Sequence, residues 1–195
     1  MRDARVLVGV TGGIAAYKAC EVVRLVVKGG GRVRVIMTEA ARRFVTPLTF
    51  ETLSGAPVGV DLFGPRTGSP VEHVEAAAWC RVFCIVPATA DVIGKLAAGI
   101  GDDLLTTTAL ALPAATPRVL APAMNERMWA NPLVQRNLRL LESPGGGGWR
   151  TVHPVAKELA CGDFGVGGLA APEEIVKVLQ AVLGEEEGKN PKDKE

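Results

Sequence analysis

An amide and two thioethers lie close together in the segment APAMNERMWANP, which runs from Ala121 to Pro132. The amide belongs to Asn125, and the thioethers belong to Met124 and Met128. An amide that follows a strand can donate hydrogen bonds to a carboxylate, so Asn125 is a candidate ligand for an acidic substrate. Asn125 also precedes the helical stretch ERMW, and a helix cap would account for it as well. Methionine more often fills space in a core than recognises a ligand.

A thiol and an imidazole could transfer protons. Cys161 lies in ELACGDFGVGG, where the glycines are typical of a flap, whereas a buried structural cysteine such as Cys84 lies in an apolar strand. A thiol with an ordinary pKa of about 8.5 is protonated at neutral pH and can donate its proton. His73 is one of two histidines and precedes a strand, which makes it a candidate base. The alternatives are an incidental surface cysteine, and a histidine that is merely exposed or satisfied in the core.

Glycines and polar side chains follow the first two expected strands. Gly12 and Gly13 come after the first strand and lead into a helix, so the backbone could approach a phosphate there. The spacing is not GxGxxG, so the dinucleotide fingerprint is incomplete and an ordinary tight turn is the alternative. The second strand ends at Thr38 and Glu39. Thr38 could donate to a phosphate, and Glu39 could hold a ribose diol.

A run of small and polar residues, Pro87–Asp91 (PATAD), opens a helix after another expected strand. Small side chains at this place would allow a flat ring to lie close to the backbone. A plain helix cap is the alternative. The glycine loop, Thr38, this segment and Asn125 share one property, because each of them comes just after an expected strand.

Strands and helices alternate along the chain. Short β-branched runs are separated by helical stretches that begin with capping residues and end at glycines, which predicts βαβ units and parallel pairing. The expected strands span residues 5–10, 32–38, 81–86, 118–121 and 149–154, and the expected helices span 14–28, 46–55, a stretch from Ser69, 90–100, 102–112, part of 126–141, and 172–183. Residues 145–148 are expected to form a flexible hinge. This pattern predicts a doubly wound α/β sheet, in which ligands bind beyond the carboxyl ends of the strands.

The composition excludes several classes of protein. The 195 residues are 48% hydrophobic and 22% charged, with a net charge of +1, so one domain without a strong field toward nucleic acid or membrane is expected. No apolar run is long enough to span a bilayer. The four cysteines form neither a CxxC pair nor a zinc pattern, so we expect free thiols and no metal site. The N-terminus is typical of a strand rather than a signal peptide, and a cytoplasmic protein is expected.

Taken together, these stretches resemble the flavin-dependent cysteine decarboxylases from about Val8 to Ile175. The stretches that carry the resemblance are GVTGGIAAYK, MTEAA, VEHVE, PATADVIGKLAAGIGDDLLTTT, APAMNERMW with the following Asn131-Pro132, and ELACGDFGVGGLA. The resemblance implies a Rossmann/flavodoxin-like three-layer flavoprotein that binds FMN. It implies that residues 1–183 form the FMN-binding decarboxylase domain, and residues 184–195 are expected to be a disordered charged tail.

The resemblance also implies a role for each candidate residue. Asn125 would hold the substrate's carboxylate, Met128 would shape the pocket beside it, His73 would be the base that assists thiol oxidation, and Cys161 would protonate an enethiolate. The residues expected near the cofactor are Gly12, Gly13, Ile14, Thr38, Phe44, Ala88, Thr89, Ala90 and Asp91. The family usually has asparagine where this chain has Asp91. Because a carboxylate accepts but does not donate, that contact must change or turn outward.

The implied reaction is the FMN-dependent oxidative decarboxylation of 4′-phosphopantothenoylcysteine to 4′-phosphopantetheine in coenzyme A biosynthesis, through thioaldehyde and enethiolate intermediates. Related decarboxylases of lantibiotic peptides stop at the enethiol and lack the equivalent of Cys161. Active sites of the family form between subunits of a trimer, sometimes assembled into a dodecamer, and the enzyme is often fused to a phosphopantothenate–cysteine ligase. The alternatives are another cysteine decarboxylase of the family, an NAD(P)-binding oxidoreductase that would use only TGG and Glu39, and a non-catalytic regulatory flavoprotein.

Overall fold

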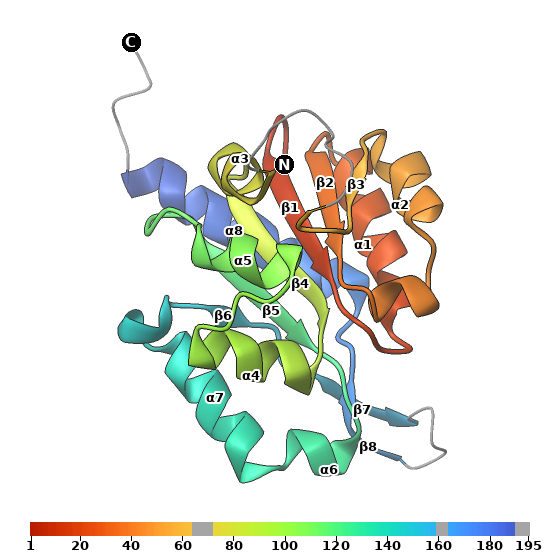
Figure 1. Ribbon diagram of the computed structural model, residues 1–195, viewed down its shortest axis with the longest axis vertical. Helices are drawn as coiled ribbons and strands as arrows, with labels where there is room; N and C mark the ends of the chain where they lie inside the picture. The colour runs from red at the N-terminus through yellow and green to blue at the C-terminus, as the bar shows by residue number, and fades with distance from the viewer. Residues whose placement is uncertain (64–71, 159–163, 190–195) are drawn as a thin grey trace.

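The computed structural model describes residues 1–63, 72–158 and 164–189, and its centre is a parallel sheet of six strands (Figure 1). The strands lie side by side in the order β3-β2-β1-β4-β5-β6. Their bounds are β1 Arg5–Val10, β2 Arg32–Met37, β3 Val58–Gly59, β4 Val82–Ala88, β5 Arg118–Pro122 and β6 Arg150–Thr151. The strand order reverses between β1 and β4, as in a doubly wound sheet. The predicted doubly wound parallel sheet is therefore confirmed, although the short strand β3 was not expected.

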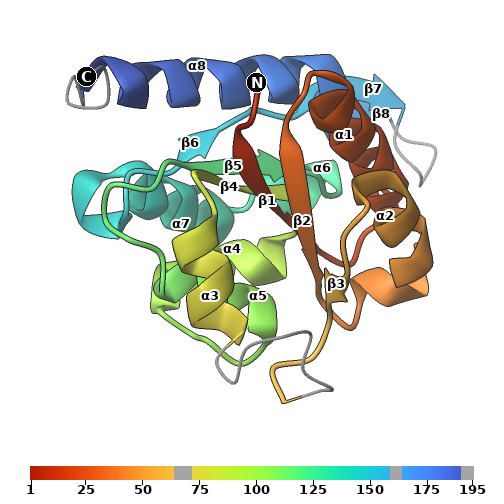
Figure 2. The ribbon, with the colours of Figure 1, turned by 90° about the horizontal axis from the view of Figure 1, so that it is seen from above.

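Helices cover both faces of this sheet and give the molecule three layers (Figure 2). The helices on one face are α1 Ala16–Lys28, α2 Pro47–Ser54 and α8 Pro172–Lys189. The helices on the other face are α3 Glu72–Trp79, α4 Ala90–Ala98, α5 Leu104–Leu110 and α7 Pro132–Glu142. The short helix α6, Glu126–Trp129, follows β5. None of the helices in the described part of the chain has the length and apolar character needed to cross a bilayer.

The central strands are apolar because both of their faces are covered. Every residue of β4 is buried, and β1 is buried from Val6 to Val10. Alternate residues of β1 enter opposite layers, since Val6 and Val8 pack in the cluster that contains α1 and α8 whereas Leu7 packs in the other cluster. Near-continuous apolar strands of this kind are typical of parallel sheets with helices on both sides.

Cys84 lies in the middle of β4 with no exposed surface, as a structural cysteine should. Burial raises the pKa of its thiol to about 12, because a thiolate at this position would lose its hydration. In the unfolded chain the thiol ionises near its ordinary pKa of about 8.5. The folded protein therefore keeps a proton that the unfolded chain releases. The resulting contribution to stability is complete below the unfolded pKa and is lost as the pH rises toward the folded one.

We expect this one thiol to lower the free energy of unfolding by about 1.4 kcal/mol for each pH unit above roughly pH 9. Denaturant titrations at a series of alkaline pH values measure the slope. The variant Cys84→Ala is the control, because it has no ionisable group at this position. Its stability should fall less steeply than that of the wild type by about this amount, and parallel slopes for the two proteins would contradict the assignment.

Two glycine-rich segments are more regular than expected. Strands β7 (Val155–Glu158) and β8 (Phe164–Gly168) pair as an antiparallel hairpin where the sequence indicated only a loop. Short strands with several glycines have a weak hydrophobic period, so the pattern did not reveal them. The expected flexible hinge at residues 145–148 begins in a 3₁₀ turn, η2 Pro144–Gly146. This turn is held by Ser143, whose hydroxyl accepts a hydrogen bond from the N–H of Gly146 at 3.2 Å.

Helix α8 continues to Lys189 rather than ending at Leu183. The expectation of a disordered tail is therefore wrong for residues 184–189, and residues 190–195 lie outside the described part of the chain. Both carboxylate oxygens of Glu185 bind the guanidinium of Arg150 at 3.0 Å, which ties this part of the helix to β6. Glutamate is also a good helix former, so the acidic composition favours continuation of the helix.

Candidate functional site

Hydrogen bonds join the segments that follow β2, β1, β4 and β5 along the carboxyl edge of the sheet. The N–H of Thr38 donates to the carbonyl of Val10 at 3.0 Å, and the N–H of Ala123 donates to the carbonyl of Ala88 at 3.2 Å. Between these two bonds, Thr11 bridges the two central strands. In open α/β sheets, ligands bind at this edge where the strand order reverses. These segments therefore frame the candidate site.

Thr11 connects the two strands between which the order reverses. Its side chain is buried, and its hydroxyl donates to the carbonyl of Pro87 at 2.6 Å and accepts from the N–H of Thr89 at 3.1 Å. A hydroxyl can donate and accept at once, so one side chain satisfies both backbone groups. The loops after β1 and β4 are thereby held together. Sequence analysis missed this role of Thr11, because its two partners lie 76 and 78 residues away.

The loop after β1 has no room for a side chain at Gly12, whereas a small side chain would fit at Gly13. A Cβ at Gly12 would overlap the side chain of Ala40 and lie 2.9 Å from the carbonyl carbon of Ala40, in the segment that follows β2. A Cβ at Gly13 would meet only the methyl group of Thr89 among the described residues, at an ordinary contact distance of 3.8 Å. Gly12 thus allows the loop after β1 to touch the loop after β2. Gly13 lies opposite Thr89 in the loop after β4.

Helix α1 begins directly after this loop and is suited to hold an anion. Ala15 occupies its N-cap position, where among the described residues no side chain accepts a hydrogen bond from the helix, and its first turn contains no acidic residue. The first N–H groups of a helix lack partners within the helix, and the helix dipole adds positive charge at this end. The field at this place would attract a phosphate, and N–H groups other than those of Gly13, Ala16 and Lys18, which donate to nearby carbonyls, could bind it. The residues present therefore fit the phosphate of a flavin nucleotide.

Thr38 and Glu39 differ in what they could offer a ligand. The hydroxyl of Thr38 accepts a hydrogen bond from the N–H of Ala41 at 3.2 Å and so begins the 3₁₀ turn η1, Ala41–Arg43. Glu39 forms an ion pair with Arg42 at 2.7 Å on the surface. The carboxylate that could have held a ribose diol thus pairs within its own turn in this structure.

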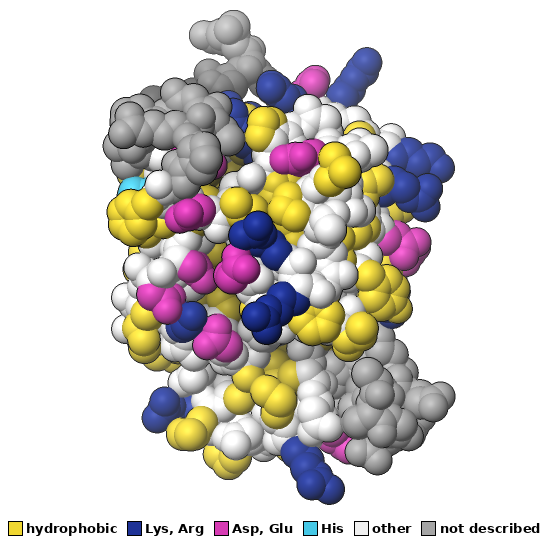
Figure 3. Space-filling model, turned by 45° about the vertical axis from the view of Figure 1, so that its right-hand side comes forward, with side chains coloured by type: hydrophobic (Ala, Val, Ile, Leu, Met, Phe, Trp, Pro, Cys, Tyr) yellow, Lys and Arg dark blue, Asp and Glu magenta, His cyan; other side chains and the backbone are white. Residues whose placement is uncertain are grey.

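Hydrophobic side chains remain exposed in the segments that frame the site. Ile14, Phe44 and Met128 are between 46% and 60% exposed, and they lie in the segments that follow β1, β2 and β5. Figure 3 shows exposed hydrophobic side chains on one face of the molecule, among charged groups of both signs. A flat apolar ring that covered such side chains would remove apolar surface from water, which is favourable.

The segment after β4 is a helix cap, as the simpler interpretation held. The hydroxyl of Thr89 accepts a hydrogen bond from the N–H of Val92 at 3.3 Å and caps α4. Asp91 pairs with Lys95 at 3.3 Å, and Lys95 also pairs with Asp102 at 3.1 Å. The hydrogen bond with Asp102, together with the negative charge of Asp91, raises the pKa of Lys95. The carboxylate of Asp91 is exposed and pairs with Lys95 along its own helix, and its role toward the cofactor stays a prediction.

Asn125 caps α6 and lies at the same edge as the glycine loop. Its side-chain oxygen accepts a hydrogen bond from the N–H of Arg127 at 2.9 Å. The cap uses the acceptor end of the amide, whereas a carboxylate would need the donor end. The cap and the ligand role are therefore compatible. Just before Asn125, the N–H of Met124 donates to the carbonyl of Gly167 in β8 at 2.9 Å.

His73 and Cys161, the residues expected to transfer protons, are not seen to join the cofactor loops and Asn125. His73 is half-buried on α3, and among the described residues no hydrogen bond, ion pair or ring contact joins it to Thr11, Thr89 or Asn125. Cys161 lies outside the described residues, between the ends of β7 and β8. The structure thus brings together the expected cofactor loops and Asn125 at one edge, and the roles of His73 and Cys161 stay predictions.

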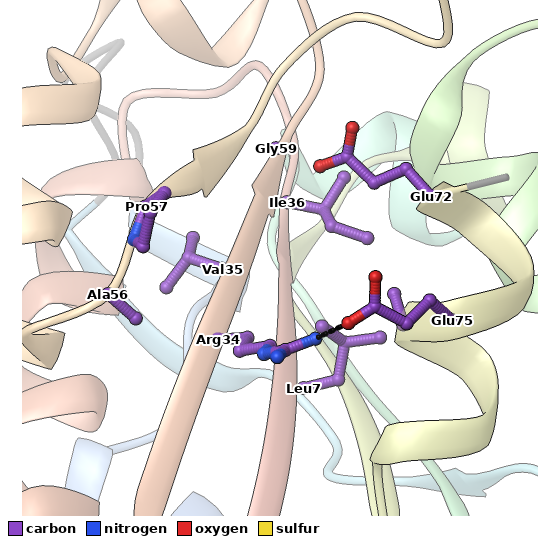
Figure 4. Close-up of a pocket in the computed structure, with 10 residues that line it drawn as sticks. Leu7, Arg34, Val35, Ile36, Ala56, Pro57, Gly59, Glu72 and Glu75 are labelled. Carbon is purple, nitrogen blue, oxygen red and sulfur yellow. Dashed lines mark hydrogen bonds and ion pairs between the residues drawn. The ribbon is translucent and has the colours of Figure 1, made fainter. Parts of the chain in front are cut away.

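A separate hollow of about 90 Å³ lies beside β2, between α3 and the segment that precedes β3 (Figure 4). Arg34 reaches across it to Glu75 at 3.0 Å and lies over the ring of Trp79, 4.7 Å from its centroid. The residues that line the hollow are Leu7, Arg34, Val35, Ile36, Ala56, Pro57, Gly59, Glu72, Glu75 and Ala76. Small-molecule sites usually enclose roughly 300–1,000 Å³, so this hollow is too small for a flavin.

Known proteins that resemble the chain include enzymes of coenzyme A biosynthesis. The bifunctional protein CoaBC of Bacillus subtilis is 46% identical over 186 residues, which cover 95% of this chain and 45% of that protein. CoaBC of Escherichia coli is 42% identical over 177 residues, which cover 91% of this chain and 42% of that protein. The chain therefore spans less than half of the length of these curated relatives.

Solved structures with the same fold include FMN-binding proteins. A mutant of PPC decarboxylase in complex with pantothenoylaminoethenethiol has a TM-score of 0.81 and 31% identity, covering 92% of this chain and 98% of that chain. The FMN-dependent cysteine decarboxylase SpaF has a TM-score of 0.78 and 33% identity, covering 93% and 96%. A family model described as Flavoprotein matches residues 1–184. The chain belongs to the Flavoprotein family, which confirms the resemblance on which the expected fold and cofactor rested.

Proposed function

We propose that this chain carries out the FMN-dependent decarboxylation of 4′-phosphopantothenoylcysteine to 4′-phosphopantetheine. The observation that carries the proposal is a series of hydrogen bonds along one edge of the sheet, which joins the segment before Asn125 to the loop of Gly12 and Gly13. At this edge Asn125 would donate to a carboxylate and the glycine loop would bind an anion. The similarity to CoaBC and to PPC decarboxylase supports the choice of substrate. Incubation of the flavin-loaded protein with 4′-phosphopantothenoylcysteine, followed by mass analysis, tests it. An unchanged substrate would overturn the proposal.

The described residues could hold FMN at this edge. The backbone at Gly12 and Gly13 and the N-terminus of α1 would bind its phosphate, and Ile14 and Phe44 would cover apolar ring surface. Thr38 and the segment 88–91 stay predicted contacts. When bound, FMN supplies the acceptor for an electron pair from the thiol-bearing carbon and returns that pair at the end of the cycle.

Three side chains would do the remaining work. The amide nitrogen of Asn125 would donate to the substrate's carboxylate and hold it in the orientation from which carbon dioxide leaves. His73 would accept the proton of the substrate's thiol. Cys161 would give a proton to the enethiolate that remains, so that the reduced thiol is the product. A protein that stopped earlier would release the enethiol instead.

The variant Asn125→Asp separates the helix-capping role of this side chain from its proposed role in binding the substrate's carboxylate. Aspartate caps helices as well as asparagine does, so stability and flavin content should stay near those of the wild type. The carboxylate lacks the donor and repels the substrate's own carboxylate, so kcat/KM should fall about 100-fold or more. Steady-state kinetics and thermal unfolding of the flavin-loaded variant measure both effects. Full turnover in this variant would remove Asn125 from substrate binding.

We also propose that the protein self-associates and that His73 acts in the site of a neighbouring copy. The position of His73 on α3, without a contact to Thr11, Thr89 or Asn125 among the described residues, supports this arrangement. Exposed Ile14, Phe44 and Met128 would also be covered by a second chain.

Mixed oligomers provide the test of this arrangement. His73→Asn and Asn125→Asp should each be nearly inactive alone, and flavin should remain bound in both. Unfolding and refolding the two variants together should restore measurable turnover, because some sites would then receive an intact His73 from one chain and an intact Asn125 from another. A mixture as inactive as its components, in a protein that forms oligomers, would contradict the exchange of His73 between copies.

The curated relatives are bifunctional by name, and we propose a phosphopantothenate–cysteine ligase, in the same or a separate chain, as the functional partner. A cytoplasmic location is part of the same proposal. The alternative of an NAD(P)-binding oxidoreductase would leave Asn125 and Cys161 without a role. A tightly bound yellow chromophore in the purified protein would count against that alternative.

A further inference from the structure

Strand β8 packs its backbone directly onto the segment that carries Asn125, and Figure 1 shows β8 beside α6. Gly165 and Gly167 of β8 face this segment and are both buried, whereas Val166 between them is partly exposed. Alternate residues of a strand share a face, so these two glycines form one contact surface. Without a side chain on that surface, the hydrogen bond from Met124 to Gly167 can form at 2.9 Å.

The two glycines differ in what an added methyl group would meet. At Gly167 it would overlap the carbonyl oxygen of Met124 and lie 3.3 Å from the backbone carbon of Asn125. Backbone atoms cannot yield without moving the loop. At Gly165 the three atoms nearest to the methyl group would all belong to the carboxyl group of Glu126. This group is the far end of an exposed, flexible side chain, which can turn into solvent.

We propose that Gly167 is a positioning residue that sets where Asn125 presents its amide to the substrate's carboxylate. This inference rests on the proposed function, because it takes Asn125 as the carboxylate ligand. The oxygen of that amide is fixed by the N–H of Arg127, so the position of the nitrogen follows the backbone. Among the described residues, hydrogen bonds from Ala123 to Ala88 and from Met124 to Gly167 help to hold the backbone that leads to Asn125. A displacement of about 1 Å at a reacting group can reduce a rate 100-fold.

Alanine at the two glycines gives a matched test. Neither Gly165 nor Gly167 has a positive φ, so alanine is allowed by the backbone at both positions. In the flavin-loaded protein, Gly167→Ala should lower kcat/KM for 4′-phosphopantothenoylcysteine roughly 10- to 100-fold. Inhibition by 4′-phosphopantetheine, which lacks the carboxylate, should stay within about twofold of the wild type, as should flavin content. Gly165→Ala should change none of these quantities beyond that limit.

Several results would overturn the inference. They are an unaltered kcat/KM in Gly167→Ala, an equal loss in Gly165→Ala, or a loss of product affinity as large as the loss in kcat/KM. If Gly167→Ala does not fold, hydrogen exchange in the wild type tests whether the backbone at Met124 is restrained. The amide of Met124 should exchange as slowly as the amides of β5, and exchange at the rate of an open loop would contradict the proposed restraint.

The Asn125→Asp variant distinguishes failure of this inference from failure of the proposed function. If Asn125→Asp retains full turnover, the assignment of Asn125 fails whatever happens at Gly167. If Asn125→Asp is impaired and Gly167→Ala is not, then only the positioning role fails. Impairment of both, with an unaffected Gly165→Ala, is the expected result.

Discussion

Thr11→Val should lower the free energy of unfolding by about 2–4 kcal/mol and remove most of the bound flavin. Valine has the shape of threonine but lacks the hydroxyl, so the buried carbonyl of Pro87 and the N–H of Thr89 would both lose their partner. Each unpaired group costs roughly 1–3 kcal/mol. The loops after β1 and β4 would no longer be held together, and the cofactor site between them would lose its shape. Denaturant unfolding and the visible absorbance of the purified protein measure the two effects.

Thr11→Ser is the matched control for this experiment. Serine keeps the hydroxyl and loses only a methyl group, so most of the bound flavin should be retained and the loss of stability should be about 1 kcal/mol. If valine and serine had the same effect, packing rather than hydrogen bonding would explain the importance of the position. Undiminished flavin content in Thr11→Val would show that the bridge does not shape the site.

Gly12→Ala should weaken FMN binding at least 10-fold and destabilise the flavin-free protein by about 1–3 kcal/mol. The added Cβ would overlap the side chain of Ala40, and it would lie 2.9 Å from a backbone carbon of that residue, so one of the two loops must move. Titration of the flavin-free protein with FMN and thermal unfolding measure these quantities.

Gly13→Ala is the neighbouring control, because its Cβ would have ordinary contact with Thr89. The stability of the flavin-free protein should change by less than about 0.5 kcal/mol in this variant. A second change, Ala40→Gly, should recover part of the stability lost in Gly12→Ala, since it removes the side chain with which the new methyl collides. Equal stabilities of Gly12→Ala and Gly13→Ala would contradict the close approach of the two loops.

The periodic parts of the chain could be predicted from the sequence, because their signals are local. The buried run of β4, the proline at the start of α2 and the cap at Thr89 each lie within a few residues of the element that they specify. The hairpin of β7 and β8 could not be predicted in the same way. It is joined to the rest of the fold by a hydrogen bond from Met124, which is distant in sequence, and its own glycines are typical of a loop.

The candidate site was partly predictable for a related reason. Residues that follow strands in a doubly wound sheet must gather at one edge, so the topology placed Gly12, Thr38, Thr89 and Asn125 together. What holds them together could not be deduced, because each bond depends on partners distant in sequence. The bridge of Thr11 is the main example. Outside the site, the continuation of α8 past Leu183 also involves a distant partner, since an ion pair joins Arg150 to Glu185.

The bridge between the loops after β1 and β4 has a consequence for biosynthesis. A nascent chain that has emerged only as far as β2 contains the glycine loop but no partner for it, because Pro87 and Thr89 follow much later. Cofactor uptake must therefore wait until β4 has left the ribosome and aligned beside β1. The appearance of yellow colour would then report that two segments 76 residues apart in the chain have met.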